Sequence, residues 1–159
     1  IANGIGITTL VDPLQAAVID NVTIEGNTIS GNNNSGIALQ YRTNNAVIIH
    51  NKIGTDITGI IPLGNTSSGI TLSSDNATIV CANNRIGGTS VYDRNIISDN
   101  IGMGVFISGN VVDTVIQGNF IGTDATGTLD LGNLGDGILI ESQITGDLAC
   151  TNNSIGGLL

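Results

Sequence analysis

An internal duplication runs through this chain of 159 residues, and equivalent residues in its two copies lie 68 positions apart. Residues 36–69 read GIALQYRTNNAVIIHNKIGTDITGIIPLGNTSSG, and residues 104–137 read GVFISGNVVDTVIQGNFIGTDATGTLDLGNLGDG. The two segments align without a gap. We place the copies at about 27–94 and 95–159, within one domain that covers residues 1–159. Repeats of this size are typical of stacked architectures, in which each unit buries its apolar face against its neighbour.

A shorter period lies inside the 68-residue unit. The signature Gly-apolar-x-apolar recurs at steps of 33, 35 and 33 residues and begins at Gly36, Gly69, Gly104 and Gly137. Each step contains three short strand-like patches. The chain has 26 Ile, 23 Gly and 20 Asn, and Ile favours strands whereas Gly and Asn favour tight turns. The pattern predicts an all-β fold, a right-handed parallel β-helix (a β-solenoid) with three short strands per turn and about five turns.

Alternation along each strand predicts three stacked apolar walls. Their members are Ile37, Leu39, Ile70, Leu72, Val105, Ile107, Ile138 and Ile140 in the first wall, Ile24, Ile48 and Ile116 in the second, and Ile29, Ile53, Ile97 and Ile121 in the third. Four asparagines hold equivalent turn positions, namely Asn27, Asn51, Asn95 and Asn119. Stacked asparagines pass amide hydrogen bonds from one layer to the next, so we expect an asparagine ladder. The four signature glycines are also expected to be structural.

A β-propeller or β-sandwich is the alternative fold. Both would require two-residue hairpin turns between antiparallel strands, whereas this repeat favours a parallel stack. Two longer connections interrupt the short turns, at residues 54–68 and 122–136, and both open with Gly-Thr-Asp. They are expected to project from the same corner, two turns apart.

The chain is strongly acidic, with 4 Lys and Arg, 13 Asp and Glu, and a net charge of −9. Nucleic-acid binding is disfavoured, because it requires cations that displace phosphate counterions. The apolar runs are too short for a membrane span. Because the sequence opens with Ile1, we interpret it as a mature or excised piece of a longer array. Open solenoid ends expose strand edges, which predicts end-to-end self-association.

Three phrases carry a resemblance to a known group. IQGNFIGTDATGTLDLGN, NNRIGG and RNIISDN resemble the right-handed parallel β-helix repeats of the pectin lyase-like superfamily, in particular those of large secreted or surface-attached microbial proteins. The resemblance covers almost the whole chain. It implies the fold and an extracellular or cell-surface location. It implies no single activity, because the fold carries lyases, hydrolases, epimerases, adhesins and inert spacers.

Two small groups of residues are candidates for chemistry. His50 and Lys52, with Arg42 nearby in the sequence, provide a base and two cations of the kind that a polysaccharide lyase requires. A surface-turn histidine is the simpler interpretation. Asp56 and Asp124 recur in the Gly-Thr-Asp loops, where a carboxylate caps backbone amides or binds calcium. We expect the capping role, no catalytic residue and no cofactor.

The two cysteines, Cys81 and Cys150, are expected two turns apart. Two turns rise by about 9.6 Å at the usual strand spacing, which is too far for a disulfide. We expect buried, inert thiols.

These observations favour a non-catalytic extracellular β-helix segment that acts as a stalk, a spacer or an adhesive, polysaccharide-contacting surface. The first alternative is a carbohydrate-active β-helix enzyme: a lyase, a hydrolase or an epimerase. The second is a calcium- or ligand-binding module that uses the Gly-Thr-Asp loops. Expected partners are polysaccharides or cell-surface components.

Overall fold

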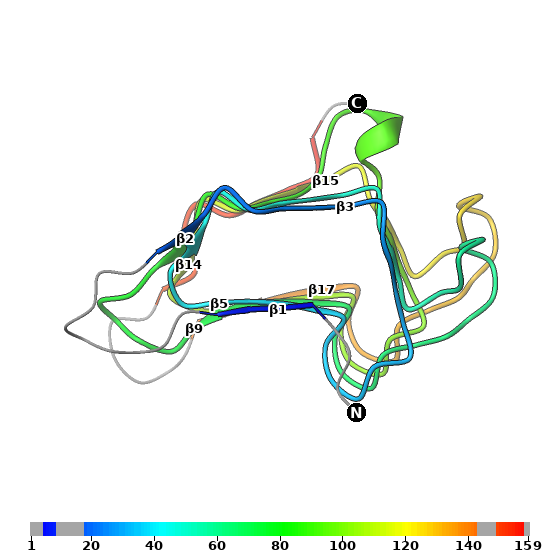
Figure 1. The fold of residues 1–159 in the computed structure, drawn as a ribbon, viewed down its shortest axis with the longest axis horizontal. Coiled ribbons are helices and arrows are strands. Elements are labelled where there is room, and N and C mark those ends of the chain that lie inside the picture. Colours follow the sequence, from blue (N-terminus) through cyan, green and yellow to red (C-terminus); the bar gives the residue numbers. More distant parts are fainter. Residues whose placement is uncertain (1–4, 9–17, 143–148, 158–159) are drawn as a thin grey trace.

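The computed structural model describes residues 5–8, 18–142 and 149–157, and Figure 1 shows successive coils of chain lying over one another. The strands are β1 (Ile5–Thr8), β2 (Ile19–Asp20), β3 (Thr23–Glu25), β4 (Thr28–Ile29), β5 (Ile37–Gln40), β6 (Thr43–Asn44), β7 (Val47–Ile49), β8 (Lys52–Ile53), β9 (Ile70–Ser74), β10 (Cys81–Ala82), β11 (Arg85–Gly87), β12 (Ile96–Ile97), β13 (Val105–Gly109), β14 (Val111–Val112), β15 (Val115–Gln117), β16 (Phe120–Ile121), β17 (Ile138–Glu141) and β18 (Ser154–Ile155). One 3-10 turn, η1 (Val91–Asp93), is the only helix in these ranges.

Every pair of these strands is parallel, and each strand pairs with strands of the adjacent coils. Three sheets run along the stack, in the orders β1-β5-β9-β13-β17, β3-β7-β11-β15-β18 and β4-β8-β12-β16. The register places each predicted wall residue on its copy, as in the pairing of Ile53 with Ile97 and of Ile97 with Ile121. The predicted all-β stack of parallel strands is confirmed, because hairpins between these strands would have produced antiparallel ladders.

The interior consists of the predicted apolar walls. Ile37, Leu39, Ile48, Ile53 and Ile97 have no exposed surface. Near the C-terminal end of the described chain, Ile121 is only partly buried against this core. Ile86, which the predicted second wall omitted, is also fully buried and pairs with Ile48 and Ile116. Stacked β-branched side chains fit one another on such a pleated surface and form one continuous core.

The structure has additional short strands at one corner. β2 pairs with β6, and β10 pairs with β14, so that a two-residue strand precedes β3, β7, β11 and β15 in each coil. The three predicted walls are present, but most coils contain a fourth strand. The equally short strands of the third wall are marked by the Asn-x-Ile signature, whereas these additional strands share no repeated signature, so sequence reasoning missed them.

Two asparagine ladders hold the corners together. In the predicted ladder, Asn27, Asn51 and Asn95 each donate their side-chain amide to Oδ1 of the ladder asparagine on the following coil, at 2.8 to 3.1 Å. Their backbone amides donate to the same oxygens. A second ladder, which sequence reasoning missed, has the same geometry and comprises Asn32, Asn65, Asn100 and Asn133. Both ladders run through four successive coils.

The signature glycines lie beside the second ladder. A Cβ on Gly36 would fall 2.8 Å from the carbonyl oxygen of Gly69 and 2.9 Å from Nδ2 of Asn65. Gly69 and Gly104 meet the next coil in the same way. At these positions any side chain would collide with backbone, which explains why glycine recurs at each step.

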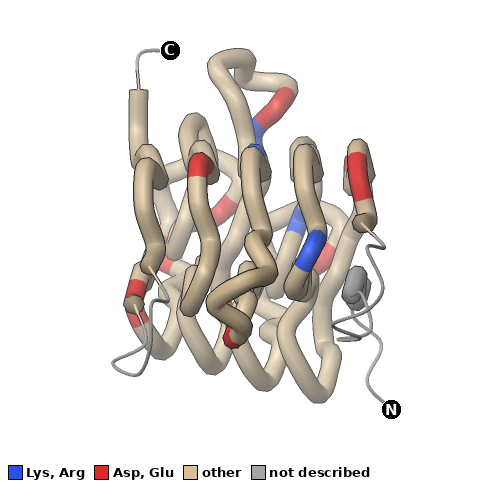
Figure 2. Tube along the Cα trace, turned by 90° about the vertical axis from the view of Figure 1, so that its left-hand side faces the viewer, with Lys and Arg blue, Asp and Glu red and all other residues tan. Residues whose placement is uncertain are grey.

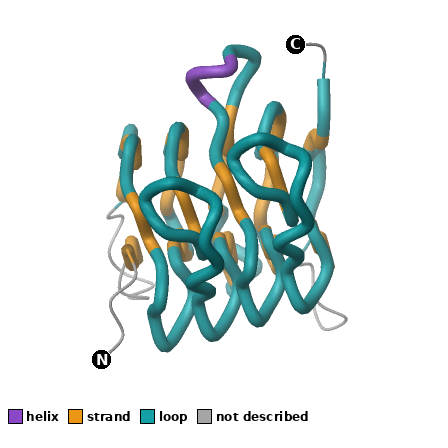
Figure 3. Tube along the Cα trace, turned by 90° about the vertical axis from the view of Figure 1, so that its right-hand side faces the viewer, coloured by secondary structure: helices purple, strands orange, loops and turns teal. Residues whose placement is uncertain are grey.

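The two longer loops project from one corner, as predicted, and Figure 3 shows them side by side. Each is closed by an antiparallel bridge, between Thr55 and Pro62 in the first and between Thr123 and Asp130 in the second. The backbone amide of Ala125 donates to the carbonyl oxygen of Gly59 at 2.8 Å. The loops therefore contact each other directly across two coils. Among the described residues, no helix is long and apolar enough to cross a bilayer.

Candidate functional site

The first ladder ends each coil at a sharp corner, and the residue before each ladder asparagine sets the character of that corner. These residues are Gly26, His50, Arg94 and Gly118 in successive coils. The outer two are glycines with φ near +70°, and His50 has a left-handed φ of 56°. Two adjacent coils therefore carry cationic or titratable side chains where their neighbours carry glycine.

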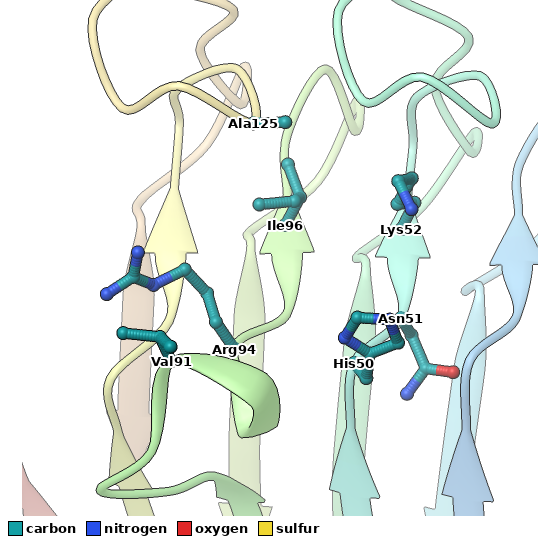
Figure 4. A pocket seen from close by; sticks show the side chains of 7 residues that line it. All are labelled: His50, Asn51, Lys52, Val91, Arg94, Ile96 and Ala125. Atoms are coloured by element: carbon teal, nitrogen blue, oxygen red, sulfur yellow. The ribbon is translucent and has the colours of Figure 1, made fainter.

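A surface pocket of about 210 Å³ lies at this corner. Its lining residues are His50, Asn51, Lys52, Val91, Arg94, Ile96 and Ala125. Lys52 and Ile96 are register partners on β8 and β12, and the backbone amide of His50 donates to the carbonyl oxygen of Asp93. In Figure 4, His50 and Lys52 come from one coil and Val91 and Arg94 from the next. The η1 turn forms the wall on the Arg94 side.

The two longer cationic side chains of the pocket are held differently. The stem of Lys52 packs along the first long loop, since a Cβ on Gly59 would lie 3.6 Å from its Cδ and Cε. The guanidinium group of Arg94 lies over the ring of Phe120, 4.0 Å from the centroid, and its Nε donates to the carbonyl oxygen of Gly118. Figure 4 shows the tip of Arg94 turned away from Lys52. The two charges therefore lie on opposite sides of Ile96.

Not all of the predicted catalytic group comes together. His50 and Lys52 line the pocket, whereas Arg42 lies between β5 and β6, where its carbonyl oxygen accepts from the amide of Ile19. Strand β7 separates Arg42 from His50, and Figure 1 places the β2–β6 corner at the opposite end of the sheet from the long loops. Arg94 takes the place beside His50 that sequence proximity suggested for Arg42.

The repeated aspartates cap their own loops. Oδ1 of Asp56 accepts from the hydroxyl of Thr58 at 2.7 Å and from the amides of Ile60 and Ile61. Oδ1 of Asp124 accepts from the hydroxyl of Thr126 and from the amides of Thr128 and Leu129. This is the capping arrangement that the sequence suggested. In the described ranges, no group of three or more His, Cys, Asp or Glu side chains is placed to hold a metal ion.

Capping changes the acidity of both carboxyl groups. The hydrogen bond from Thr58, assisted by the loop amides, lowers the pKa of Asp56 to about 2, although some desolvation opposes the change. For Asp124 desolvation is the largest effect and raises the pKa, but the bonds from Leu129, Thr126 and Thr128 together outweigh it, so that the pKa is lowered. Both loops are thus built around an ionised aspartate.

A second hollow, of about 260 Å³, lies on the outer face of the sheet that contains β5, β9 and β13. It is lined by Gln40, Tyr41, Thr71, Ser73, Asp75, Phe106 and Ser108. Tyr41 has a left-handed φ of 55°, and burial, the charge of Asp75 and a hydrogen bond to Asp75 raise its pKa. Tyr41 and Phe106 come from different coils, so their proximity was not evident from the sequence.

The cysteines are free thiols, as expected. Cys81 is fully buried on β10, and its thiol donates to the carbonyl oxygen of Thr43. Burial raises the pKa of Cys81 to about 12, even though a hydrogen bond from Asn84 opposes the rise. Cys150 is only half-buried, in contrast to the prediction, because it lies in the last coil, where fewer neighbours cover it. Desolvation also raises its pKa.

No family model, curated protein or solved structure matches this chain.

Proposed function

We propose that this chain is a non-catalytic, right-handed parallel β-helix segment of the pectin lyase-like kind that serves outside the cell as a stalk or spacer. The observation that carries this proposal is the pair of asparagine ladders, each continuous through four coils. Ladder residues such as Asn95 and Asn100 are fully buried. Hydrogen bonds of this kind lock each coil to the next and make a rigid rod whose length scales with the number of coils. The right hand follows from the strong preference of parallel strand crossovers.

The distribution of charge agrees with a passive role. Titratable groups are few, and Figure 2 shows them scattered over the side that it faces. The lowered carboxyl pKa values, those of Asp56 and Asp124, belong to loop caps whose oxygens are already engaged by their own loops. An acid–base hydrolase requires a pair of carboxyl groups that are free to exchange a proton with a substrate, and no acidic side chain lines the pocket that contains His50.

The outer face of β5, β9 and β13 is the surface that we assign to polysaccharide contact. Its hollow combines two aromatic rings, Tyr41 and Phe106, with hydroxyl and amide groups. Sugars present apolar faces that pack on aromatic rings and hydroxyl groups that bond to polar side chains. End-to-end self-association remains part of the proposal, because among the described residues β17 is an edge strand of its sheet. A single monomeric mass in light scattering at all protein concentrations would contradict end-to-end self-association.

The spacer role is tested by lengthening the rod. A variant with an additional copy of residues 69–136 is expected to fold and to extend the maximum dimension in small-angle scattering by about 10 Å, which is two strand spacings.

A second experiment addresses catalysis and adhesion. Incubation with acidic and neutral polysaccharides should release no products, and retention on the polysaccharide should fall when Phe106 is replaced by Ala. Product release would favour the enzyme alternative, and an unfolded extended variant would contradict the modular rod.

A further inference from the structure

The pocket beside the first ladder concentrates positive charge in an acidic protein. Two of the four Lys and Arg residues, Lys52 and Arg94, line it together with the single histidine, His50, although the net charge of the chain is −9. None of its lining residues is acidic. The nearby carboxylate of Asp93 is engaged elsewhere, since it pairs with Arg85 at 3.3 Å. The charge of the lining side chains is therefore opposite in sign to the net charge of the chain.

The polar groups of this pocket are available to a ligand. Within the ranges that the structure describes, the ammonium group of Lys52 has neither an ion pair nor a hydrogen bond, and the ring of His50 has no hydrogen-bond partner. Arg94 uses its Nε on the carbonyl oxygen of Gly118, and its terminal nitrogens make no bond within the same ranges. Each of these groups is a donor when it is protonated, and an ionised acceptor makes the strongest hydrogen bonds with such donors.

The backbone at His50 also points to a use for its side chain. Its φ of 56° lies in the left-handed region, which few L-residues adopt, although Asn, Asp and His do so more often than the others. Gly26 and Gly118 fill the equivalent corners at φ 71° and 69° without that cost. A residue that is held in an unfavourable conformation where glycine fits is typical of functional positions.

The size and the remaining walls define the ligand. A pocket of about 210 Å³ is smaller than those that enclose drug-sized molecules, so it accommodates one small group. Ile96, Val91 and Ala125 provide apolar surface beside the cations. We propose that His50, Lys52 and Arg94 form an anion-binding site for a carboxylate, sulfate or phosphate group that is carried on a small apolar body. The anion contacts Lys52 and His50, and the guanidinium group at the rim adds to the attraction.

The experiment titrates the 159-residue chain with benzoate and with phenyl phosphate and follows backbone amide signals by NMR. Both anions are expected to shift the signals of residues 50–53 and 94–96, whereas benzyl alcohol, which has the same ring without the charge, should not. Inorganic phosphate, which lacks the apolar body, should bind more weakly than phenyl phosphate. The ratio of the benzoate and phenyl phosphate affinities distinguishes a carboxylate site from a phosphate site.

Variants separate this site from a general charge effect. Lys52→Met is expected to weaken binding about tenfold or more, the loss of one charge-assisted hydrogen bond. Arg42→Gln removes the same charge at the distant corner and should leave binding unchanged. His50→Gly installs the residue of the neighbouring corners and should weaken binding in a folded protein. Lys52→Arg keeps the positive charge and should retain anion binding. This variant still tests the role of the charge if Lys52→Met does not fold.

The proposal fails if benzyl alcohol binds as well as benzoate, if Arg42→Gln and Lys52→Met weaken binding equally, or if none of the probes shifts the corner signals at about 10 mM. It does not depend on the polysaccharide surface. Phe106→Ala, which tests that surface, should leave anion binding unchanged.

Discussion

The side-chain amide of Asn100 occupies the space that a side chain on Gly69 would need, because a Cβ built on Gly69 falls 2.9 Å from its Nδ2. The same Cβ would lie 2.7 Å from a methyl carbon of Ile97 and 2.8 Å from the carbonyl oxygen of Gly104. The glycine signature and the second ladder are therefore two parts of one corner. Because Gly69 has no side chain, the buried side-chain amide of Asn100 can lie directly against the coil that contains Gly69.

Gly69→Ala is expected to destabilise the protein by about 1–3 kcal/mol, because backbone and a buried amide must move to admit the methyl group. Gly137→Ala is the matched control. It changes the same signature position in the last described coil, where the Cβ meets only a methyl carbon of Ile121 at 3.5 Å. Its effect should stay within about 0.5 kcal/mol. Urea unfolding followed by circular dichroism measures both, and equal losses would contradict the steric explanation.

Asn95→Ala is expected to cost about 2 kcal/mol, because it leaves the buried backbone amide of Asn51 without its acceptor and removes the bonds of the Asn95 side chain to Asn51 and to the carbonyl oxygen of Ile48. Asn27→Ala tests the end of the same ladder. Asn27 is exposed and gives its side-chain amide to Asn51 and to Glu25, so its removal should cost less than about 1 kcal/mol. Unfolding midpoints in urea compare the two. An equal loss of unfolding free energy at both positions would mean that burial of the ladder asparagines does not contribute to stability.

His50→Gly is expected to stabilise the fold by about 1 kcal/mol, since glycine adopts the left-handed corner without a Cβ clash. His50→Ala removes the imidazole but keeps the Cβ, and it should change stability by less than about 0.5 kcal/mol. Thermal unfolding of both variants separates backbone strain from loss of the ring. Equal melting temperatures for Gly and Ala would show that the corner is not strained.

The loop that Asp56 caps should weaken in acid. Its pKa of about 2 in the folded protein lies below the ordinary value of 3.8, so its contribution is complete above about pH 4 and is lost as the pH falls toward 2. In Asp56→Asn the side chain does not titrate. The stability of the wild type relative to this variant should therefore fall with acidification only in that window. Urea midpoints at several pH values measure the difference, and the carboxyl carbon signal of Asp56 reports its titration directly.

Cys81 should resist alkylation in the native state. With a pKa of about 12 its thiolate is scarce at about pH 8, and the residue is fully buried. Cys150, which is half-buried, is expected to react with iodoacetamide at least about 100-fold faster. Mass spectrometry of digested, labelled protein gives both rates, and unfolded protein provides the control in which the two should be similar. Rapid native labelling of Cys81 would mean that its coil opens readily.

Much of the fold could be predicted because the repeat forces equivalent residues into equivalent places. The walls around Ile53 and Ile97 and the ladder of Asn51 and Asn95 follow from alternation and from the 68-residue offset. The second ladder was missed because its asparagines lack the Asn-x-Ile signature. A usable signal exists, since each of them lies four residues before a signature glycine, as Asn65 does before Gly69.

The candidate pocket was harder to predict because its two sides are far apart in sequence. Ladder partners are 24 residues apart between Asn27 and Asn51 but 44 apart between Asn51 and Asn95. The longer step arises because a long loop and η1 both lie between these two corners. Sequence proximity therefore paired His50 with Arg42, whereas the coiling of the backbone places it beside Arg94.

The contact between the two long loops bears on how such a chain grows. The carbonyl oxygen of Gly59 accepts from the amide of Ala125, and these loops occur on alternate coils. Adding a single coil would leave a loop facing a bare corner, but adding two reproduces the contact. A repeat of two coils therefore preserves this contact between the loops, which agrees with a sequence repeat of 68 residues where a single coil is about half as long.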